Sequence, residues 1–146
     1  MIAVVEIPKG VTILKAELLP NNTMKYKSFS RPTYYPANYG FITDTLAPDG
    51  DALDTFIIGP RLETLSRVKV EHLAILFVED QEGEDNKVIC KPKGMTTTYA
   101  PFAWHVEAIV KLLETYKLGM DGKFCKVLHI GDREDAIEEI AKCKLG

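Results

Sequence analysis

The chain contains 146 residues, of which 46% are hydrophobic and 27% are charged, and these values are typical of a folded globular protein rather than a disordered one. Its net charge of −3 argues against a nucleic-acid-binding protein, because such domains usually carry a strongly basic face. The length predicts one domain that spans residues 1–146 and buries a substantial core.

The N-terminal segment does not resemble a signal peptide. It reaches the charged Glu6 and then Pro8 before an apolar stretch of the necessary length can form. The chain has no run of about 18 apolar residues that could cross a bilayer. We therefore expect a cytoplasmic protein with no membrane partner. Its cysteines, Cys90, Cys125 and Cys143, are odd in number and far apart, which favours reduced thiols over disulfides or a zinc site.

The first part of the chain alternates β-like segments with turn signals. Residues 2–7 predict a strand, and residues 11–19 predict a second strand after a Pro-Lys-Gly break. An Asn-Asn turn signal follows, so residues 23–28 are expected to return as a hairpin partner. Lys15 and Glu17 are two residues apart and therefore project from one face of their strand, where an exposed ion pair is the ordinary interpretation.

Residues 33–42, TYYPANYGFI, are rich in aromatic side chains and interrupted by proline, asparagine and glycine. This composition predicts an ordered loop packed by its own rings. A tyrosine hydroxyl could also donate a hydrogen bond to a phosphate oxygen. Base stacking on a small barrel is a rival use of these rings, and the lack of a basic groove counts against it.

Three carboxylates, those of Asp49, Asp51 and Asp54, occur within six residues and precede an apolar run at 55–58. In an extended strand Asp54 would point away from the other two, so convergence requires the bend that Gly50 permits. Hard divalent cations such as Mg²⁺ prefer oxygen ligands of this kind. A solvated turn is the plainer interpretation of Pro-Asp-Gly-Asp, and the segment alone leaves both open.

A second acidic segment follows a long apolar one. Residues 68–79 predict a strand, and residues 80–87 form a polar connection with four acids and one lysine. Residues 88–91 predict the returning strand, so the acidic segment is expected to be a hairpin tip. Such tips are often acidic for solubility alone. Residues 92–101 are expected to form a loop.

Two helices are predicted near the C-terminus. The first should begin near Phe102 and end before Gly119. Its apolar stripe consists of Phe102, Val106, Ile109, Val110, Leu113 and Tyr116. Residues 123–129 predict a short strand between the two helices.

The last helix is expected to use Asp132 as its N-cap, with Asp135 three residues further on. Its buried side is predicted to comprise Ala136, Ile137, Ile140 and Ala141.

Several well-known motifs are missing or incomplete. The chain has no P-loop, GxGxxG or GxSxG motif, which argues against a P-loop kinase, a Rossmann dehydrogenase and an α/β-hydrolase. An EF-hand starting at Asp49 fails, because its sixth and twelfth positions hold Asp54 and Pro60. The histidines His72, His105 and His129 form no ligand spacing and are expected to be structural or exposed.

The motifs together resemble the soluble (family I) inorganic pyrophosphatases. Residues 49–54, DGDALD, resemble the family signature D-G-D-P-hydrophobic-D, with alanine in place of the proline. Further motifs agree in order and spacing: Glu6-Ile7-Pro8, Lys15-x-Glu17, Tyr35-Pro36-Ala37-Asn38-Tyr39-Gly40, Asp80-x-x-Gly83-Glu84-Asp85-x-Lys87 and Tyr116-Lys117. The resemblance implies an α+β fold, a compact OB-like closed β-barrel with two helices packed outside.

The resemblance also implies Mg²⁺-dependent hydrolysis of inorganic pyrophosphate to two orthophosphates, with several Mg²⁺ ions or another divalent ion such as Mn²⁺. A catalyst must neutralise this highly charged anion and activate water, and paired metal ions can do both. By resemblance, Asp49, Asp54 and Asp85 hold the first metal, with Asp54 also bridging to a second. Asp51 is the expected general base. Asp80 and Asp85 would bind a metal that arrives with the substrate, and Glu6 and Glu17 would act mainly through metal-bound waters.

By the same resemblance, six side chains would contact the phosphoryl groups: Lys15, Lys27, Tyr39, Lys87, Tyr116 and Lys117. A homo-oligomer is expected. Position 27 is normally an arginine in the family, and lysine cannot offer the same two-pronged contact to phosphate. This departure motivates a second hypothesis, a catalytically weak phosphate- or nucleotide-binding protein on the same fold. A third, motivated by the tyrosines alone, is an OB-type binder of single-stranded nucleic acid.

Overall fold

The computed structural model describes the chain except for residues 12, 29–33, 97–98, 118–119 and 146, and it describes only the backbone of residues 13–18, 24–28 and 99–103. The elements in chain order are β1 (Ile2–Ile7), β2 (Ile13–Leu18), β3 (Met24–Ser28), β4 (Asn38–Ile42), β5 (Asp54–Ile57), β6 (Arg67–Asp80), β7 (Gly83–Glu84), β8 (Lys87–Pro92), α1 (Tyr99–Thr115), β9 (Cys125–Gly131) and α2 (Arg133–Cys143).

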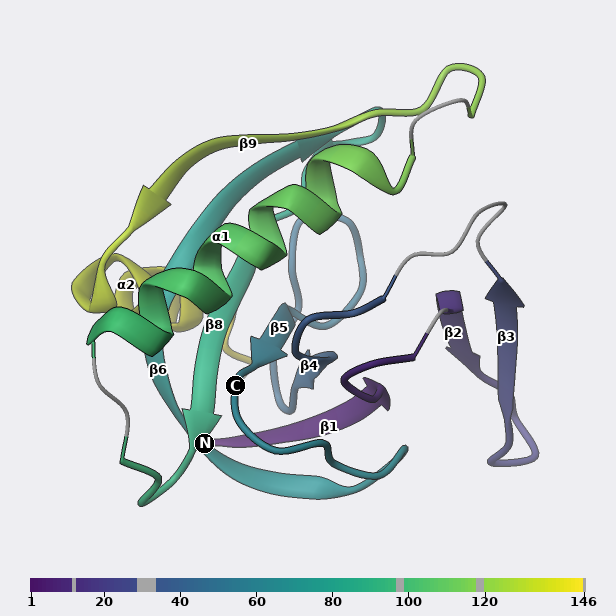
Figure 1. Ribbon diagram of the computed structural model, residues 1–146. Coiled ribbons are helices and arrows are strands. Elements are labelled where there is room, and N and C mark those ends of the chain that lie inside the picture. Colours follow the sequence, from purple (N-terminus) through teal and green to yellow (C-terminus); the bar gives the residue numbers. More distant parts are fainter. Residues whose placement is uncertain (12, 29–33, 97–98, 118–119, 146) are drawn as a thin grey trace.

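Within the described part of the chain, five strands pair into a closed ring. β1 pairs with β4, β4 with β5, β5 with β8, β8 with β6, and β6 again with β1. Of these pairs only β5–β8 is parallel. β7 also pairs with β6, and β9 extends the sheet from β6 (Figure 1). Closure removes the free edges that an open sheet would present. The expected α+β fold with an OB-like ring and two helices is confirmed.

Both faces of the central strands are covered. In β8, Ile89 packs in a core cluster with α1, whereas Val88 and Cys90 pack in a second cluster with α2. This follows from the alternation of side chains along a strand. It also explains why these residues form a continuous apolar run rather than an alternating pattern. Just before β8, Asp85 contacts Lys87, whereas Asn86 contacts Glu139 of α2.

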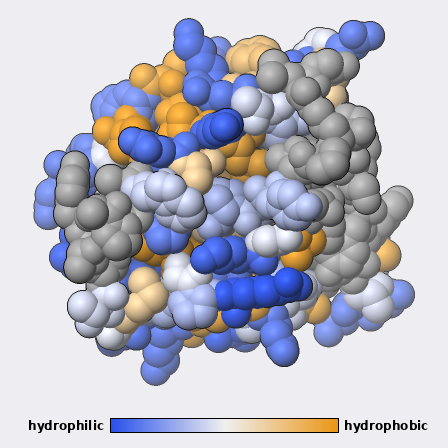
Figure 2. Space-filling model, viewed as in Figure 1, coloured by the Kyte–Doolittle hydropathy of each residue, from blue (hydrophilic) through white to orange (hydrophobic). Residues whose placement is uncertain are grey.

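The surface is mixed in polarity. Figure 2 shows hydrophilic side chains interspersed with smaller hydrophobic areas on the face that Figure 1 presents. Exposed apolar side chains such as Trp104 and Leu128 occur on different elements, α1 and β9, and single exposed apolar residues are normal for a folded protein. Neither described helix combines the length and apolarity needed to cross a membrane.

The aromatic segment is partly a strand, and the prediction of a loop was wrong for β4. Gly40, one of the residues on which the loop prediction rested, lies opposite Val5 in the β1–β4 pair. A Cβ atom on Gly40 would lie 1.8 Å from the carbonyl oxygen of Val4. Glycine is therefore needed here for close approach of two backbones, a role it also has inside strands.

The first helix begins earlier than predicted, at Tyr99 rather than near Phe102. Pro101 lies in its first turn, where the missing N–H of proline has little cost. The predicted end before Gly119 is confirmed, because the helix stops at Thr115. The buried side includes the predicted Val106, Ile109 and Leu113, and also Leu112, while the side chain of Phe102 lies outside the described residues.

The start of α2 is confirmed, and its buried side is corrected. Asp132 accepts a hydrogen bond from the backbone N–H of Asp135, and the Asp135 carboxylate accepts one from the backbone N–H of Asp132. Ile137 is 40% exposed and Ala141 is also exposed. Glu139, a residue that a count of apolar positions passes over, is buried instead.

We expect Asp132→Ala to lower the free energy of unfolding by about 1 kcal/mol, because the first turn of α2 loses a capping acceptor. Urea unfolding would measure the change. Glu134→Ala, in the same first turn, should cost only about 0.3 kcal/mol by weakening the helix-dipole interaction. Equal losses in the two variants would show that the cap contributes nothing specific.

Candidate active site

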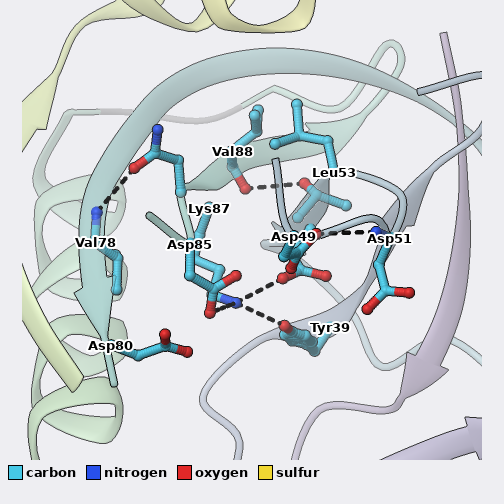
Figure 3. A network of polar contacts seen from close by, with 12 residues as sticks. Tyr39, Asp49, Asp51, Leu53, Val78, Asp80, Asp85, Lys87 and Val88 are labelled. Atoms are coloured by element: carbon cyan, nitrogen blue, oxygen red, sulfur yellow. Dashed lines mark hydrogen bonds and ion pairs between the residues drawn. The ribbon is translucent and has the colours of Figure 1, made fainter. Parts of the chain in front are cut away.

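Three carboxylates converge at the start of β5 and β8. Asp49, Asp54 and Asp85 each offer an oxygen, and the three oxygens lie within 4.8 Å of one another. The parallel β5–β8 pair places the two strand starts side by side, with Asp54 aligned with Lys87. Gly50 adopts a positive φ of 90°, which is the bend that the sequence predicted would be needed. Figure 3 shows the resulting cluster.

Lys87 is the counter-ion of this cluster. Its ammonium lies 2.6 Å from Oδ2 of Asp54 and 2.8 Å from Oδ2 of Asp85, and it donates a hydrogen bond of 3.0 Å to the Tyr39 hydroxyl (Figure 3). Its side chain is only 4% exposed. Burial by itself would lower the pKa of Lys87, but Tyr39, Asp54 and Asp85 outweigh burial and hold that pKa well above its ordinary value.

The acids of the cluster differ in exposure, since Asp54 and Asp85 are mostly buried whereas Asp49 is exposed. Burial raises the pKa of Asp54 to about 6, against the opposing effect of Lys87. Burial also raises the pKa of Asp49, while a hydrogen bond from the backbone N–H of Asp51 acts in the opposite direction. Desolvation of a carboxylate favours its neutral form. A further positive charge beside these acids would therefore stabilise their charged forms.

We expect divalent-ion affinity to fall as the pH drops below about 6. Because the pKa of Asp54 in the folded protein is raised to about 6, the carboxylate carries a proton below that pH, and an entering cation must displace it. The loss should approach about tenfold per pH unit. Calorimetric titration with Mn²⁺ from about pH 7 to about pH 5 would measure it. Constant affinity over that range would contradict the prediction.

Asp51 lies in the same turn as Asp49, but its carboxylate is not one of the three that converge. Its backbone N–H donates to Oδ1 of Asp49 at 3.0 Å, and its carbonyl oxygen accepts from the backbone N–H of Ala47 at 2.7 Å. The side chain is exposed. Its carboxylate lies beside the cluster, away from the contacts of Lys87 (Figure 3). The turn is therefore fixed while this carboxylate stays accessible to solvent.

A second acid–cation pair lies at the end of β6. Lys117 lies 3.5 Å from Oδ2 of Asp80 and donates a hydrogen bond of 3.2 Å to Oε1 of Gln81. Both charged side chains are mostly buried, with 14% and 11% exposure for Lys117 and Asp80. The backbone N–H of Phe124 also donates to Gln81. Gln81 therefore links Lys117 to the backbone of Phe124, a role that its position beside Asp80 alone did not reveal.

The predicted tyrosines line the same region. The ring of Tyr39 packs edge-on against Phe56 at 4.8 Å and against Tyr35 at 5.7 Å between centroids. Burial raises the pKa of Tyr39 well above its ordinary value, so its hydroxyl keeps its proton. Burial likewise raises the pKa values of Tyr35 and Tyr116, and the ammonium of Lys117 lies 5.5 Å from the ring centroid of Tyr116.

Tyr35 is a member of this region that the sequence analysis did not single out. Burial is the largest cause of its raised pKa, and the charges of Lys87, Glu6 and Asp54 also act on it. It therefore lies within electrostatic reach of the acidic cluster and of β1. The signal for it was its place in the same YPANYG motif that contains Tyr39. The charge of Glu6, a predicted site residue in β1, contributes to the raised pKa of Tyr35.

The remaining predicted residues lie on the β2–β3 hairpin, whose side chains are outside the described part of the structure. The strand register pairs Lys15 directly with Lys27, and Glu17 with Lys25. The hairpin stands next to β1 (Figure 1). The backbone register therefore makes Lys15 and Lys27 cross-strand neighbours.

The sequence profile of the inorganic pyrophosphatase family matches residues 3–145. The chain belongs to the inorganic pyrophosphatase family. An inorganic pyrophosphatase of Nanoarchaeum equitans is 34% identical over 96% of this chain and 92% of its own length. One from Aquifex pyrophilus is 35% identical over 95% of this chain and 84% of its own length.

Solved pyrophosphatase structures share the fold of this family member. The structure of the Thermus thermophilus inorganic pyrophosphatase superposes with a TM-score of 0.88 at 31% identity, over 98% of this chain and 88% of that chain. That of the Coxiella burnetii inorganic pyrophosphatase also gives 0.88, at 28% identity over 98% and 92% of the two chains. The family resemblance inferred from the motifs is confirmed. Membership places the chain among the diphosphatase hydrolases.

Proposed function

We propose that the chain hydrolyses inorganic pyrophosphate to two orthophosphates and requires Mg²⁺ to do so. The observation that carries this proposal is the convergence of Asp49, Asp54 and Asp85 around a buried lysine in a member of the inorganic pyrophosphatase family. The alternative of a weak phosphate- or nucleotide-binding protein has less support, because the relatives described above are named as pyrophosphatases.

The cluster fits a hard divalent cation. It offers three carboxylate oxygens within 4.8 Å of one another, and Mg²⁺ and Mn²⁺ prefer oxygen ligands. Asp49, Asp54 and Asp85 would hold the first ion, and Asp80 with Asp85 would bind one that enters with the substrate. Bound ions supply positive charge to the anionic substrate and lower the pKa of water. Glu6 and Glu17 would support the ions at longer range.

Asp51 would accept the proton of the attacking water. Its carboxylate is exposed beside the cluster, and its backbone is fixed by Asp49 and Ala47. As the water oxygen forms its bond to one phosphorus, the bridging P–O bond breaks and the second phosphate departs. A positioned base of this kind typically contributes about 10²- to 10⁴-fold to the rate.

The cations and phenols would bind the phosphoryl oxygens. Lys87 and Tyr39 lie in contact with the cluster, and Lys117 with Tyr116 lies beside Asp80. Lys15 and Lys27, paired across the hairpin, would contribute further positive charge. A substrate that carries several negative charges needs such compensation in addition to the metal.

Phosphate release from pyrophosphate tests this function directly. We expect release with Mg²⁺, loss of release when the ions are chelated with EDTA, and recovery when Mg²⁺ is returned. Release that continues unchanged in EDTA would contradict the proposal. Calorimetric binding of pyrophosphate without any release would instead support the weak-binding alternative.

Lys27→Arg tests the effect of the unusual lysine. Because a guanidinium can contact two phosphate oxygens at once, we expect the variant to lower KM for pyrophosphate about threefold to tenfold. Lys25→Arg, which makes the same change at the position paired with Glu17, should leave KM nearly unchanged. Steady-state kinetics would measure both. An unaltered KM in Lys27→Arg would show that a two-pronged contact at residue 27 adds nothing to substrate binding.

A further inference from the structure

Asn86 lies between Asp85 and Lys87 in the sequence, and its side chain points away from both. It is 6% exposed and reaches toward α2, on the face of the sheet opposite the acidic cluster. Asp85 and Asn86 precede the first residue of β8, and their contacts with Lys87 and Glu139 define this arrangement. Asn86 is therefore a buried polar residue that is covalently joined to two site residues without being part of the site.

Every polar atom of the Asn86 amide has a partner. Its Oδ1 accepts a hydrogen bond of 3.0 Å from the backbone N–H of Val78, a contact drawn in Figure 3. Its Nδ2 donates to Oε1 of Glu84 at 2.6 Å and to Oε1 of Glu139 at 3.3 Å. An amide nitrogen has two hydrogens, so both are used. The backbone N–H of Asp85 also donates to the carbonyl oxygen of Val78 at 2.9 Å.

Glu139 brings helix α2 into this arrangement. Glu139 is 5% exposed. The other buried residues of α2 are Ala136 and Cys143. Besides Asn86, Glu139 contacts the thiol of Cys143 at 3.8 Å and the exposed ammonium of Lys142 at 3.8 Å. A buried carboxylate is costly unless hydrogen bonds compensate it. An apolar residue would suit this side of the helix better if stability alone mattered.

We propose that Asn86 and Glu139 are positioning residues, which fix Asp85 and Lys87 relative to Asp54 by tying the start of β8 to Val78 and to helix α2. This inference rests on the proposed function of the cluster. Partners beyond the ligands set the orientation of metal-binding carboxylates, and their loss commonly weakens metal binding about 10- to 100-fold. Helix α2 thereby supports the metal site from the opposite face of the sheet.

The test exchanges donor and acceptor within this network. Asn86→Asp keeps the acceptor for Val78 but turns a carboxylate oxygen toward Glu84 and Glu139, so we expect Mn²⁺ affinity to fall about tenfold. Adding both Glu84→Gln and Glu139→Gln supplies amide donors in the reverse direction at the two former partners and should recover most of that affinity. Glu138→Gln, an exposed change on the same helix, should have no effect. Calorimetric Mn²⁺ titration measures all four proteins, and circular dichroism confirms that they are folded.

The outcomes separate positioning from a merely structural role. A structural role would lower the thermal midpoint of Asn86→Asp without changing the Mn²⁺ affinity of the folded protein, and that result would overturn the inference. A folded triple variant, with Asn86→Asp, Glu84→Gln and Glu139→Gln, that recovers no affinity would also overturn it. If Asn86→Asp does not fold, Glu139→Ala replaces it, with an expected loss of about threefold to tenfold in affinity. Unchanged Mn²⁺ affinity in that variant would also overturn the inference.

The native protein serves to distinguish this inference from the proposed function. Native protein that binds Mn²⁺ and hydrolyses pyrophosphate, combined with unchanged affinity in the variants, overturns only the role of Asn86 and Glu139. Native protein that neither binds Mn²⁺ nor releases phosphate overturns both.

Discussion

Asp51→Asn is expected to lower kcat for pyrophosphate hydrolysis about 1,000-fold, within the range that a general base contributes. The amide cannot accept a proton from water, whereas the backbone bonds that hold the turn do not involve the changed side chain. The affinity for Mn²⁺ should therefore stay within about threefold of the native value. Steady-state kinetics at saturating Mg²⁺, together with calorimetric Mn²⁺ titration, would measure the two effects.

Asp49→Asn, two residues away in the same turn, provides the matched comparison. Asp49 belongs to the converging oxygens, so its variant should lose metal affinity first and recover much of its kcat at higher Mg²⁺. If Asp51→Asn behaved in that way too, residue 51 would be a metal ligand and the assignment of the base would be wrong.

Lys87→Met is expected to lower the free energy of unfolding of the metal-free protein by about 3 kcal/mol. The side chain is 4% exposed and its ammonium compensates two mostly buried carboxylates, those of Asp54 and Asp85. Removal of one partner from a buried ion pair leaves charges uncompensated and typically costs about 3–5 kcal/mol. Urea unfolding in EDTA would measure the loss.

Mg²⁺ should restore much of this stability, because a divalent ion can replace the missing positive charge. The variant should also bind Mn²⁺ more tightly than the native protein, since no ammonium competes for Asp54 and Asp85. Lys91→Met is the control: its ion pair with Glu71 spans 3.5 Å and is more exposed, so its loss should be about 1 kcal/mol or less. Equal destabilisation of the two variants, or no response of Lys87→Met to Mg²⁺, would contradict this role for Lys87.

The sequence predicted those features that depend on local chemistry. Asp132 and Asp135 form the expected capping box because that motif needs only neighbouring residues. The bend at Gly50 was expected for the same reason. The family resemblance, which uses the spacing of several motifs, placed Asp49, Asp54 and Asp85 together before the structure showed their convergence. Their catalytic and metal-binding roles remain predictions.

Features that depend on distant partners were not predictable from local patterns. Gly40 contributed to the prediction of a loop, because nothing nearby in the sequence reveals that the backbone of Val4 would lie against it. Lys87 was expected in an acidic hairpin tip, yet its partner Asp54 on the parallel neighbouring strand places it inside the protein. Glu139 was passed over because hydrophobic periodicity cannot identify a buried acid whose partner is 53 residues away.

Anomalous diffraction from crystals grown with Mn²⁺ is the most direct test of the metal-dependent cluster. We predict a Mn²⁺ peak among the carboxylates of Asp49, Asp54 and Asp85, with the ammonium of Lys87 no longer paired with both Asp54 and Asp85. A map with no Mn²⁺ at these carboxylates, and with Lys87 still bound to both Asp54 and Asp85, would contradict the proposed site.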